Sequence, residues 1–226
     1  MPVTLYVFDA YGTLFDVAGA ARAAAEPGSA LAALWPRLAE DWRRKQLEYT
    51  WLRRIMGQHA DFASVTADAL DWAMEAAGLP DPTLRARLLA LYQTLPAYPE
   101  VPATLAALRA RGLRTAILSN GTPGMLAAAT ASAGIEGLLD DVLSVEAIGA
   151  YKPDPQVYAL VGQRFGVAPD QVRFVSSNGW DVAGAGAFGF RTVWVNRAGQ
   201  PVDRLPHRPD LALPDLSTLP DLSGQA

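Results

Sequence analysis

The stretch VTLYVFDAYGT, residues 3–13, decides the fold of this chain. It begins as an apolar run rich in β-branched and aromatic residues, ends at Asp9, and has a glycine at position 12, where the backbone can turn sharply. This pattern predicts a buried strand that delivers a carboxylate to a loop. Ligands of open α/β sheets bind at the carboxyl ends of the strands, so Asp9 is a candidate nucleophile or metal ligand. The alternative is an Asp that merely ends a strand, because Asp favours turns and caps.

The composition excludes several classes of protein. With 226 residues, 50% of them hydrophobic, the chain is long enough to bury a full core. Its net charge of -4 comes without a long run of like charge, which argues against binding to nucleic acid or to an anionic membrane. Cysteine is absent and the two histidines, His59 and His207, lie far apart in the sequence. Any chemistry must therefore use carboxylates, hydroxyls, amides, Lys and Arg.

The first residues of the chain lack a basic segment followed by a long apolar one. No window approaches 18 uninterrupted apolar residues, the length typical of a membrane span. These observations predict a cytoplasmic protein without a membrane partner.

The segment that follows the first strand is helical in pattern. Residues 16–95 are dominated by Ala, Leu, Arg and Glu, with apolar residues at helical spacing in residues 31–56, 66–77 and 83–91. Pro and Gly separate these stretches. We therefore expect a helical cap domain at residues 16–96, inserted into an α/β core domain formed by residues 1–15 and 97–226.

Beyond Pro99 the periodicity alternates between strand and helix. Such alternation predicts a Rossmann-like parallel sheet with helices on both faces. The expected strands are residues 114–118, 142–145, 172–176 and 191–195, with one further strand at 210–213. The expected helices are residues 103–111, 124–133, 155–165 and 181–188.

Polar clusters also follow three later segments of the predicted core. They are SNG at residues 119–121, KPD at 152–154 and SSNGWD at 176–181. Taken singly, Ser119, Asn120 and Asp181 read as helix caps, and Lys152 as a solvated surface residue. Together with Asp9 they fall at one edge of the same sheet, where hydroxyl, amide and backbone N–H groups at helix amino termini bind anions. This coincidence favours a functional site.

The same residues resemble a known family. The segments FDAYGTL (8–14), SNG (119–121), YKP (151–153) and SSNGWD (176–181) look, in order, like the four motifs of the haloacid dehalogenase superfamily. The resemblance covers essentially the whole chain. The cap segment WRRKQLEYTWLR (42–53) is similar to that of the L-2-haloacid dehalogenases, the type II subgroup.

Two positions separate this subgroup from the phosphatases of the superfamily. A phosphatase needs an acid two residues after the nucleophile, and this chain has Tyr11 there, a phenol with an ordinary pKa of about 10. The phosphatases also carry a metal-binding Asp where this chain has Ser177. Halide leaves without a proton, so a dehalogenase needs neither group. A small-molecule phosphatase and a non-catalytic ligand-binding protein are the remaining alternatives.

The resemblance implies a two-step hydrolysis without metal or cofactor. Asp9 attacks C2 of a short L-2-haloacid such as L-2-chloropropionate or a haloacetate, releasing halide and leaving an inverted ester. Water then attacks the ester carbonyl and yields a D-2-hydroxy acid. Lys152 keeps Asp9 ionised, and Asp181 with Asn178 activates or positions the water.

The other roles implied by the resemblance concern binding and support. Ser119 and Tyr11 hold the substrate carboxylate, and Arg43 with Asn120 receives the halide. Leu47, Phe62 and Trp180 wall a hydrophobic pocket, for which core packing is the alternative in the case of Phe62. Thr13, Ser176 and Tyr158 support the catalytic groups. The resemblance also implies a homodimer built through cap helices, with Trp51 and Leu52 as candidate contacts.

Overall fold

The computed structural model describes residues 1–224 and has a six-stranded parallel sheet at its centre, in the order β3-β2-β1-β4-β5-β6. Every neighbouring pair of strands is parallel. The predicted α/β fold class with a parallel sheet is therefore confirmed. The strands are β1 (Leu5–Phe8), β2 (Arg114–Ser119), β3 (Asp141–Ser144), β4 (Val172–Ser176), β5 (Arg191–Val195) and β6 (Leu211–Leu213).

Strand β1 lies in the middle of the sheet, and this explains its unbroken apolar sequence. Both of its faces are covered, so every side chain of Leu5–Phe8 is fully buried. The register pairs Phe8 with Ile117 on one side and with Val175 on the other. The chain therefore leaves β1 at the edge where β2 and β4 also end.

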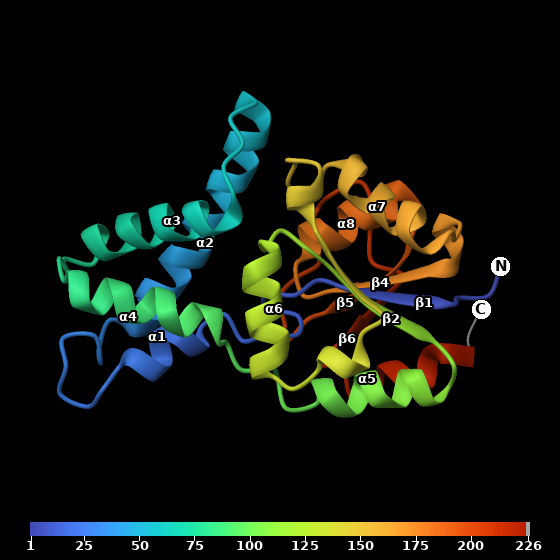
Figure 1. Ribbon diagram of the computed structural model, residues 1–226, viewed down its shortest axis with the longest axis horizontal. Coiled ribbons are helices and arrows are strands. Elements are labelled where there is room, and N and C mark those ends of the chain that lie inside the picture. Colours follow the sequence, from blue (N-terminus) through green and yellow to red (C-terminus); the bar gives the residue numbers. More distant parts are fainter. Residues whose placement is uncertain (225–226) are drawn as a thin grey trace.

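Helices cover the two faces of this sheet (Figure 1). In that view α7 and α8 lie above the sheet, whereas α5 and the short helix η4 lie below it, and α6 lies toward the cap and contacts α4. Threonine and aspartate side chains, Thr122 and Asp154, cap the starts of α6 and α7, each followed by a proline. The bounds are α5 (Val101–Ala110), α6 (Pro123–Ser132), α7 (Pro155–Phe165), α8 (Gly179–Phe188) and η4 (Leu219–Gly224).

Four helices form a second body beside the sheet, on the side away from the amino terminus and η4 (Figure 1). Helix α2 begins later than predicted, because residues 30–34 form turns, and α3 begins earlier, because the Asp61 side chain caps its first turn. Helix α1 was not predicted. Within residues 1–224 no helix combines the length and the apolar character needed to cross a membrane. The four are α1 (Gly19–Ala24), α2 (Trp35–Met56), α3 (Phe62–Ala76) and α4 (Pro82–Gln93).

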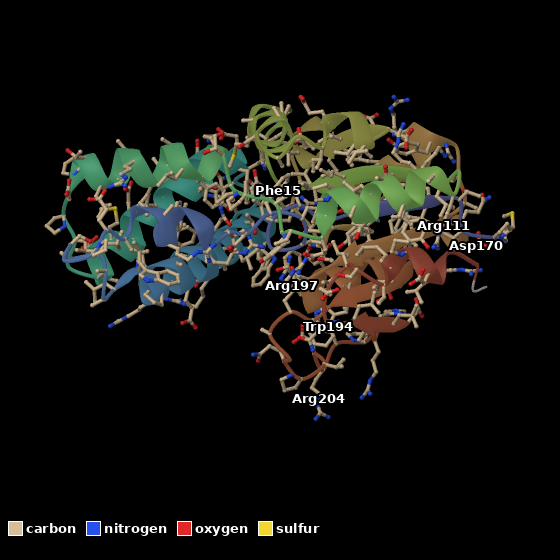
Figure 2. All side chains as sticks on the ribbon, turned by 90° about the horizontal axis from the view of Figure 1, so that it is seen from below. Phe15, Arg111, Asp170, Trp194, Arg197 and Arg204 are labelled. Carbon is tan, nitrogen blue, oxygen red and sulfur yellow. The ribbon has the colours of Figure 1, made fainter. Side chains whose placement is uncertain are left out.

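The chain enters and leaves this helical body through two adjacent segments. The Asp16 N–H donates to the Pro96 carbonyl at 2.9 Å, and the Tyr98 N–H donates to the Leu14 carbonyl at 2.9 Å. Figure 2 shows Phe15 and Arg197 at this junction. These contacts support the division into a core (residues 1–15 and 97–226) and a cap (residues 16–96), which we propose as the domain organisation.

Candidate active site

The Asp9 carboxylate lies at the carboxyl end of β1 and is held on both oxygens. Its Oδ1 accepts a hydrogen bond from Lys152 Nζ at 3.1 Å. Its Oδ2 accepts from Thr13 Oγ1 and from Asn178 Nδ2, both at 3.0 Å. The turn after the strand passes through Gly12 at a φ of 91°, a conformation that favours glycine. The residue is only 6% exposed, and these three hydrogen bonds fix the orientation of the carboxylate.

Lys152 lies between two carboxylates. Its Nζ is 3.1 Å from Asp9 Oδ1 and 2.9 Å from Asp181 Oδ2, and the side chain is 1% exposed. Burial alone would lower the pKa of this ammonium, but the two carboxylates outweigh burial, and the pKa is raised. Lys152 is therefore a cation at neutral pH. The Asn120 side chain accepts its backbone N–H at 3.1 Å, which links two of the predicted polar clusters.

Asp181, in the first turn of α8, is fully buried. Its Oδ2 accepts from Lys152, and its Oδ1 accepts from the Tyr158 hydroxyl at 2.7 Å. Burial raises the pKa of the Asp181 carboxyl, and the Lys152 ammonium opposes that rise. Burial and the Asp181 charge raise the pKa of Tyr158 well above its usual value, so the phenol remains a donor. Tyr158 thus holds one oxygen of Asp181 through its hydroxyl.

Arg43 reaches the nucleophile loop from the cap. Its Nη2 donates to the Tyr11 carbonyl at 3.1 Å and lies 3.4 Å from Asn178 Oδ1, while its Nη1 donates to Gln46 Oε1 at 2.8 Å. All three acceptors are neutral. None of the ion pairs among residues 1–224 includes Arg43. A half-buried guanidinium without a carboxylate partner is suited to receive an anion.

The Tyr11 hydroxyl is a second polar group of the site that could bind a substrate. It is buried and makes no hydrogen bond, and burial raises its pKa well above the usual value. The ring packs against Tyr92 and Phe62, with centroid distances of 5.4 and 5.6 Å. A side chain at Gly121 would lie 3.1 Å from the Tyr11 hydroxyl, which places this donor beside the SNG segment. A neutral donor there can bind a carboxylate.

Hydroxyl groups brace the loops around Asp9. Ser177 N–H donates to Thr13 Oγ1 at 2.8 Å, and Ser176 Oγ accepts the Asn178 N–H at 3.1 Å. Ser119 Oγ accepts the Gly121 N–H at 3.1 Å. Within the described part of the chain no group of three or more His, Cys, Asp or Glu side chains is arranged to hold a metal ion.

The predicted pocket residues occupy different places. Phe62 is buried against Tyr11, whereas Leu47 is half-buried on α2, four residues after Arg43. Trp180 packs edge-on against Trp51, with ring centroids 5.3 Å apart. Both indoles line a cleft of about 460 Å³ to which Lys152 also contributes. Trp180 therefore lies where Lys152 meets the cap.

Three residues that contact predicted site residues were not themselves predicted from the sequence. Gln46 holds Arg43, and Tyr92 packs on Tyr11. Glu146 accepts the Phe62 N–H at 2.9 Å through Oε1 and lies 3.0 Å from His59 through Oε2. Only Gln46 gave a usable signal, since it lies one turn after Arg43 on the same helix.

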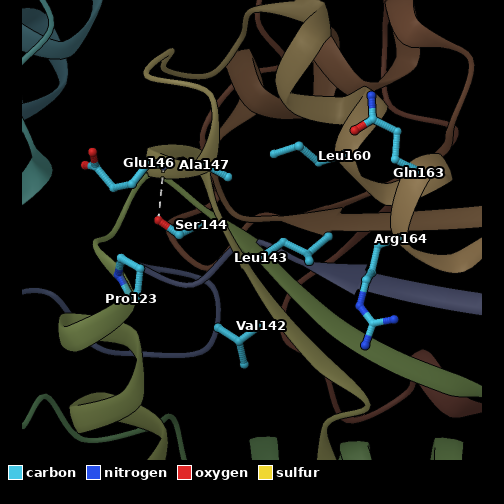
Figure 3. Close-up of a pocket in the computed structure, with 9 residues that line it drawn as sticks. All are labelled: Pro123, Val142, Leu143, Ser144, Glu146, Ala147, Leu160, Gln163 and Arg164. Atoms are coloured by element: carbon cyan, nitrogen blue, oxygen red, sulfur yellow. Dashed lines mark hydrogen bonds between the residues drawn. The ribbon is translucent and has the colours of Figure 1, made fainter.

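A separate cleft of about 620 Å³ opens at the edge strand β3 (Figure 3). It is lined by residues of β3, α6 and α7, including Leu143, Pro123 and Gln163. No predicted site residue lines it. Glu146, which accepts the Phe62 N–H, lines it as well.

Comparison with known proteins identifies the family. The model of the haloacid dehalogenase-like hydrolases matches residues 3–189. The chain belongs to this family. The resemblance found in the sequence is thus confirmed, and the Asp9 site of this haloacid dehalogenase-like hydrolase lies where its four motifs meet.

Similar proteins narrow the comparison within these haloacid dehalogenase-like hydrolases. The chain is 47% identical over 224 residues to (S)-2-haloacid dehalogenase 1 of Pseudomonas sp. (strain CBS-3), covering 98% of this chain and 96% of that protein. It is 47% identical over 197 residues to (S)-2-haloacid dehalogenase 4A of Burkholderia cepacia, covering 86% and 84%. The structure of the Xanthobacter autotrophicus L-2-haloacid dehalogenase with covalently bound chloropropionic acid is similar with a TM-score of 0.88 and 41% identity, covering 99% of this chain and all of that one.

Proposed function

We propose that this protein is an (S)-2-haloacid dehalogenase, a hydrolase that converts short L-2-haloacids to D-2-hydroxy acids and halide. The observation that carries the proposal is the pairing of a fixed carboxylate with an unpaired cation. Asp9 is held on both oxygens, and Arg43, one hydrogen bond from the same loop, has only neutral acceptors. A nucleophile facing an anion receptor suits displacement of a halide.

In the first step one Asp9 oxygen attacks C2 of the substrate in line with the carbon–halogen bond. The new C–O bond inverts C2, and the halogen leaves with the bonding electrons as halide. Lys152, at 3.1 Å, places a positive charge beside the Asp9 carboxylate before the attack. Thr13 and Asn178 fix the other oxygen, which limits rotation of the carboxylate away from the attack direction.

In the second step water attacks the carbonyl carbon of the Asp9 ester. Cleavage there breaks the bond between that carbon and the former Asp9 oxygen that is bonded to C2. The hydroxy acid leaves with that oxygen and with a proton from the water, the water oxygen stays in the regenerated Asp9 carboxylate, and the inverted C2 is retained. We assign activation of the water to Asp181 with Asn178. Both Asp181 oxygens already accept one hydrogen bond, from Lys152 and from Tyr158, and each keeps a further lone pair for water.

We assign substrate binding to side chains that can donate a hydrogen bond to an anion. The Tyr11 hydroxyl and Ser119 hold the substrate carboxylate, while Arg43 and the Asn120 amide receive the halide. The Asn120 oxygen is already engaged by Lys152, which leaves its N–H group toward the anion. Phe62, Leu47 and Trp180 provide apolar walls suited to a short alkyl chain.

The experiment that tests this function measures halide release from L- and D-2-chloropropionate in excess EDTA. A parallel assay supplies p-nitrophenyl phosphate with Mg²⁺. We expect chloride from the L isomer only, undiminished by EDTA. Phosphate release without dehalogenation would instead establish a phosphatase, and inactivity in both assays would favour a ligand-binding protein.

A single turnover in water enriched in oxygen-18 tests the ester. Hydrolysis at the Asp9 carbonyl puts the label into Asp9 and leaves the first hydroxy acid unlabelled. Label found directly in that first product would show attack of water on C2 and would exclude the covalent step.

We also propose a cytoplasmic homodimer formed through the cap. Leu52, Ile55 and Met56 near the end of α2 are 43%, 81% and 60% exposed, which leaves an apolar surface there. Trp51 is turned toward Trp180 instead. Sedimentation of the wild type and of an Ile55→Glu variant tests the dimer, because a charge on this surface should yield monomers. Cell fractionation tests the location.

A further inference from the structure

We infer that Gln46 is a positioning residue for Arg43, the proposed halide receptor. Its neutral amide orients the Arg43 guanidinium and leaves the positive charge available for the halide. This inference rests on the proposed function and adds a residue that acts through Arg43. Gln46 lies on α2 one turn after Arg43 and is 1% exposed. Its Oε1 accepts from Arg43 Nη1 at 2.8 Å, on the side of the guanidinium away from the nucleophile loop.

The amide of Gln46 is held by two other cap helices. Its Nε2 donates to Thr66 Oγ1 on α3 at 2.7 Å and to the Tyr92 hydroxyl on α4 at 3.1 Å. Three helices therefore converge behind Arg43 through one buried side chain. A substitution at Gln46 should therefore displace Arg43 more than any other residue of the site.

The direction of these hydrogen bonds fixes which end of the amide faces Arg43. Thr66 gives its own proton to the Phe62 carbonyl at 2.6 Å, so toward Gln46 it can only accept. The Nε2 group must therefore point at Thr66, and Oε1 must point at the guanidinium. A flipped amide would set its N–H group against an Arg43 N–H.

The neutrality of Gln46 matters as much as its geometry. An amide oxygen orients Arg43 without cancelling its charge, which stays available for an anion. A carboxylate in the same place would form a buried ion pair with Arg43 and compete with the halide. Burial raises the pKa of the adjacent Tyr92 phenol, so it too stays neutral.

The test compares Gln46→Glu and Gln46→Leu with wild type, using bromide as the probe at constant ionic strength. Bromide inhibition of L-2-chloropropionate turnover gives the halide inhibition constant, and tryptophan fluorescence gives bromide affinity without turnover. We expect bromide to bind about 10-fold to 100-fold more weakly to both variants, with the larger loss for Gln46→Glu. KM for the haloacid should change less than the halide constant, which a general loss of structure would not produce.

Gln163→Glu is the matched control. It introduces the same charge at an exposed position in the β3 cleft shown in Figure 3, where we expect unchanged bromide affinity. Tyr92→Phe is a second, shape-conserving variant that removes one acceptor of Nε2, and should weaken bromide binding about threefold.

Failure of the inference is distinguishable from failure of the proposed function. A wild type that binds bromide but releases no halide from any haloacid overturns the proposed function. In that case the bromide affinities of the Gln46 variants, measured by fluorescence, still decide the role of Gln46. Unchanged bromide affinity in Gln46→Glu and Tyr92→Phe overturns the inference, as does a wild type that binds no bromide.

Discussion

Arg43, on the cap helix α2, donates to the main-chain carbonyl of Tyr11, on the loop that follows the nucleophile, across 3.1 Å. This hydrogen bond joins the cap to the core, as do the contacts of Glu146 with Phe62 and His59. In the proposed function this contact holds the halide receptor in register with Asp9. Displacement at carbon needs that alignment, because attacking and leaving atoms must lie in line.

Replacing Arg43 with Lys should weaken halide binding and catalysis together. A lysine keeps the charge but cannot donate at once to Tyr11, to Gln46 and to an anion. We expect kcat/KM for L-2-chloropropionate to fall about 10-fold to 100-fold. Arg44→Lys is the control on the neighbouring, exposed position, and its kcat/KM should stay within about twofold of wild type. Equal losses in the two variants would contradict the assignment.

Tyr11→Phe should raise the stability of the protein and weaken its binding of substrate. The hydroxyl is buried without a partner, so its removal should stabilise the free protein by about 1 kcal/mol, or about 2–4 °C in melting temperature. KM should rise about tenfold, because the substrate carboxylate loses a donor. Tyr158→Phe provides the contrast, since its hydroxyl bonds Asp181 and its loss should lower the melting temperature. Calorimetry and initial rates measure both effects.

Lys152→Met should make stability depend on pH in a new way. The variant leaves Asp9 and Asp181 buried without their shared cation, and we expect a loss of about 3–5 kcal/mol near neutral pH. Without the opposing ammonium the pKa of Asp181 rises further, so the folded state binds more protons than the unfolded state, and stability should increase as pH falls from 8 to 5. Urea midpoints at these two pH values measure the effect.

In the wild type the contribution of Lys152 to stability should not change between pH 5 and 8. Because the folded pKa of Lys152 is raised above 10.5, its contribution is fully present below that pH and is lost only as pH rises through the folded pKa. Lys45→Met, at a partly buried lysine of α2 whose one carboxylate partner, Glu48, is 37% exposed, should cost less than Lys152→Met at either pH. An equal loss in both lysine variants would argue against the buried ion pairs.

Asp9→Asn should abolish halide release while the protein remains folded. The amide is similar in shape to the carboxylate but is not a nucleophile, so we expect the rate to fall about 10⁴-fold or more. Lys152 keeps Asp181 as its partner, which leaves a buried cation with a counter-ion. Halide release and circular dichroism report the two properties. Residual turnover at more than a tenth of wild type would exclude Asp9 as the nucleophile.

Glu146→Ala should loosen the wall of the pocket. Glu146 accepts the Phe62 N–H and pairs with His59, so its loss frees the segment that precedes α3. We expect the preference for chloroacetate over L-2-chlorobutyrate to change, with a loss of about 1–3 kcal/mol in stability. Asp71→Ala, which removes a surface ion pair between α3 and α4, should leave the preference unchanged.

The strands and most helices could be predicted because their patterns are local. The unbroken apolar run before Asp9 indicates a strand with both faces covered, and β1 has that environment. Helix α1 escaped prediction because its six residues are mostly alanine and carry no amphipathic stripe. The start of α2 was placed too early because periodicity does not distinguish turns from a first helical turn.

The site was predictable only as far as its motifs. Asp9 and Lys152 are 143 residues apart, and their pairing entered through the family resemblance and not through local pattern. Tyr92 and Glu146 carry no motif, so their contacts with Gln46 and Phe62 depend on how the cap packs. The unpartnered Tyr11 hydroxyl is likewise visible only in three dimensions.

The two adjacent chain crossings at Leu14–Asp16 and Pro96–Tyr98 have a practical consequence. Because the segments between them are hydrogen-bonded to each other, the inserted helices begin and end at nearly the same point in space. The insert can therefore be exchanged as one unit, because both junctions lie in the hydrogen-bonded pair of segments 14–16 and 96–98. Arg43 and Gln46 belong to the insert, whereas Asp9 and Lys152 belong to the core. Such an exchange would therefore replace the proposed halide receptor and leave the proposed nucleophile in place.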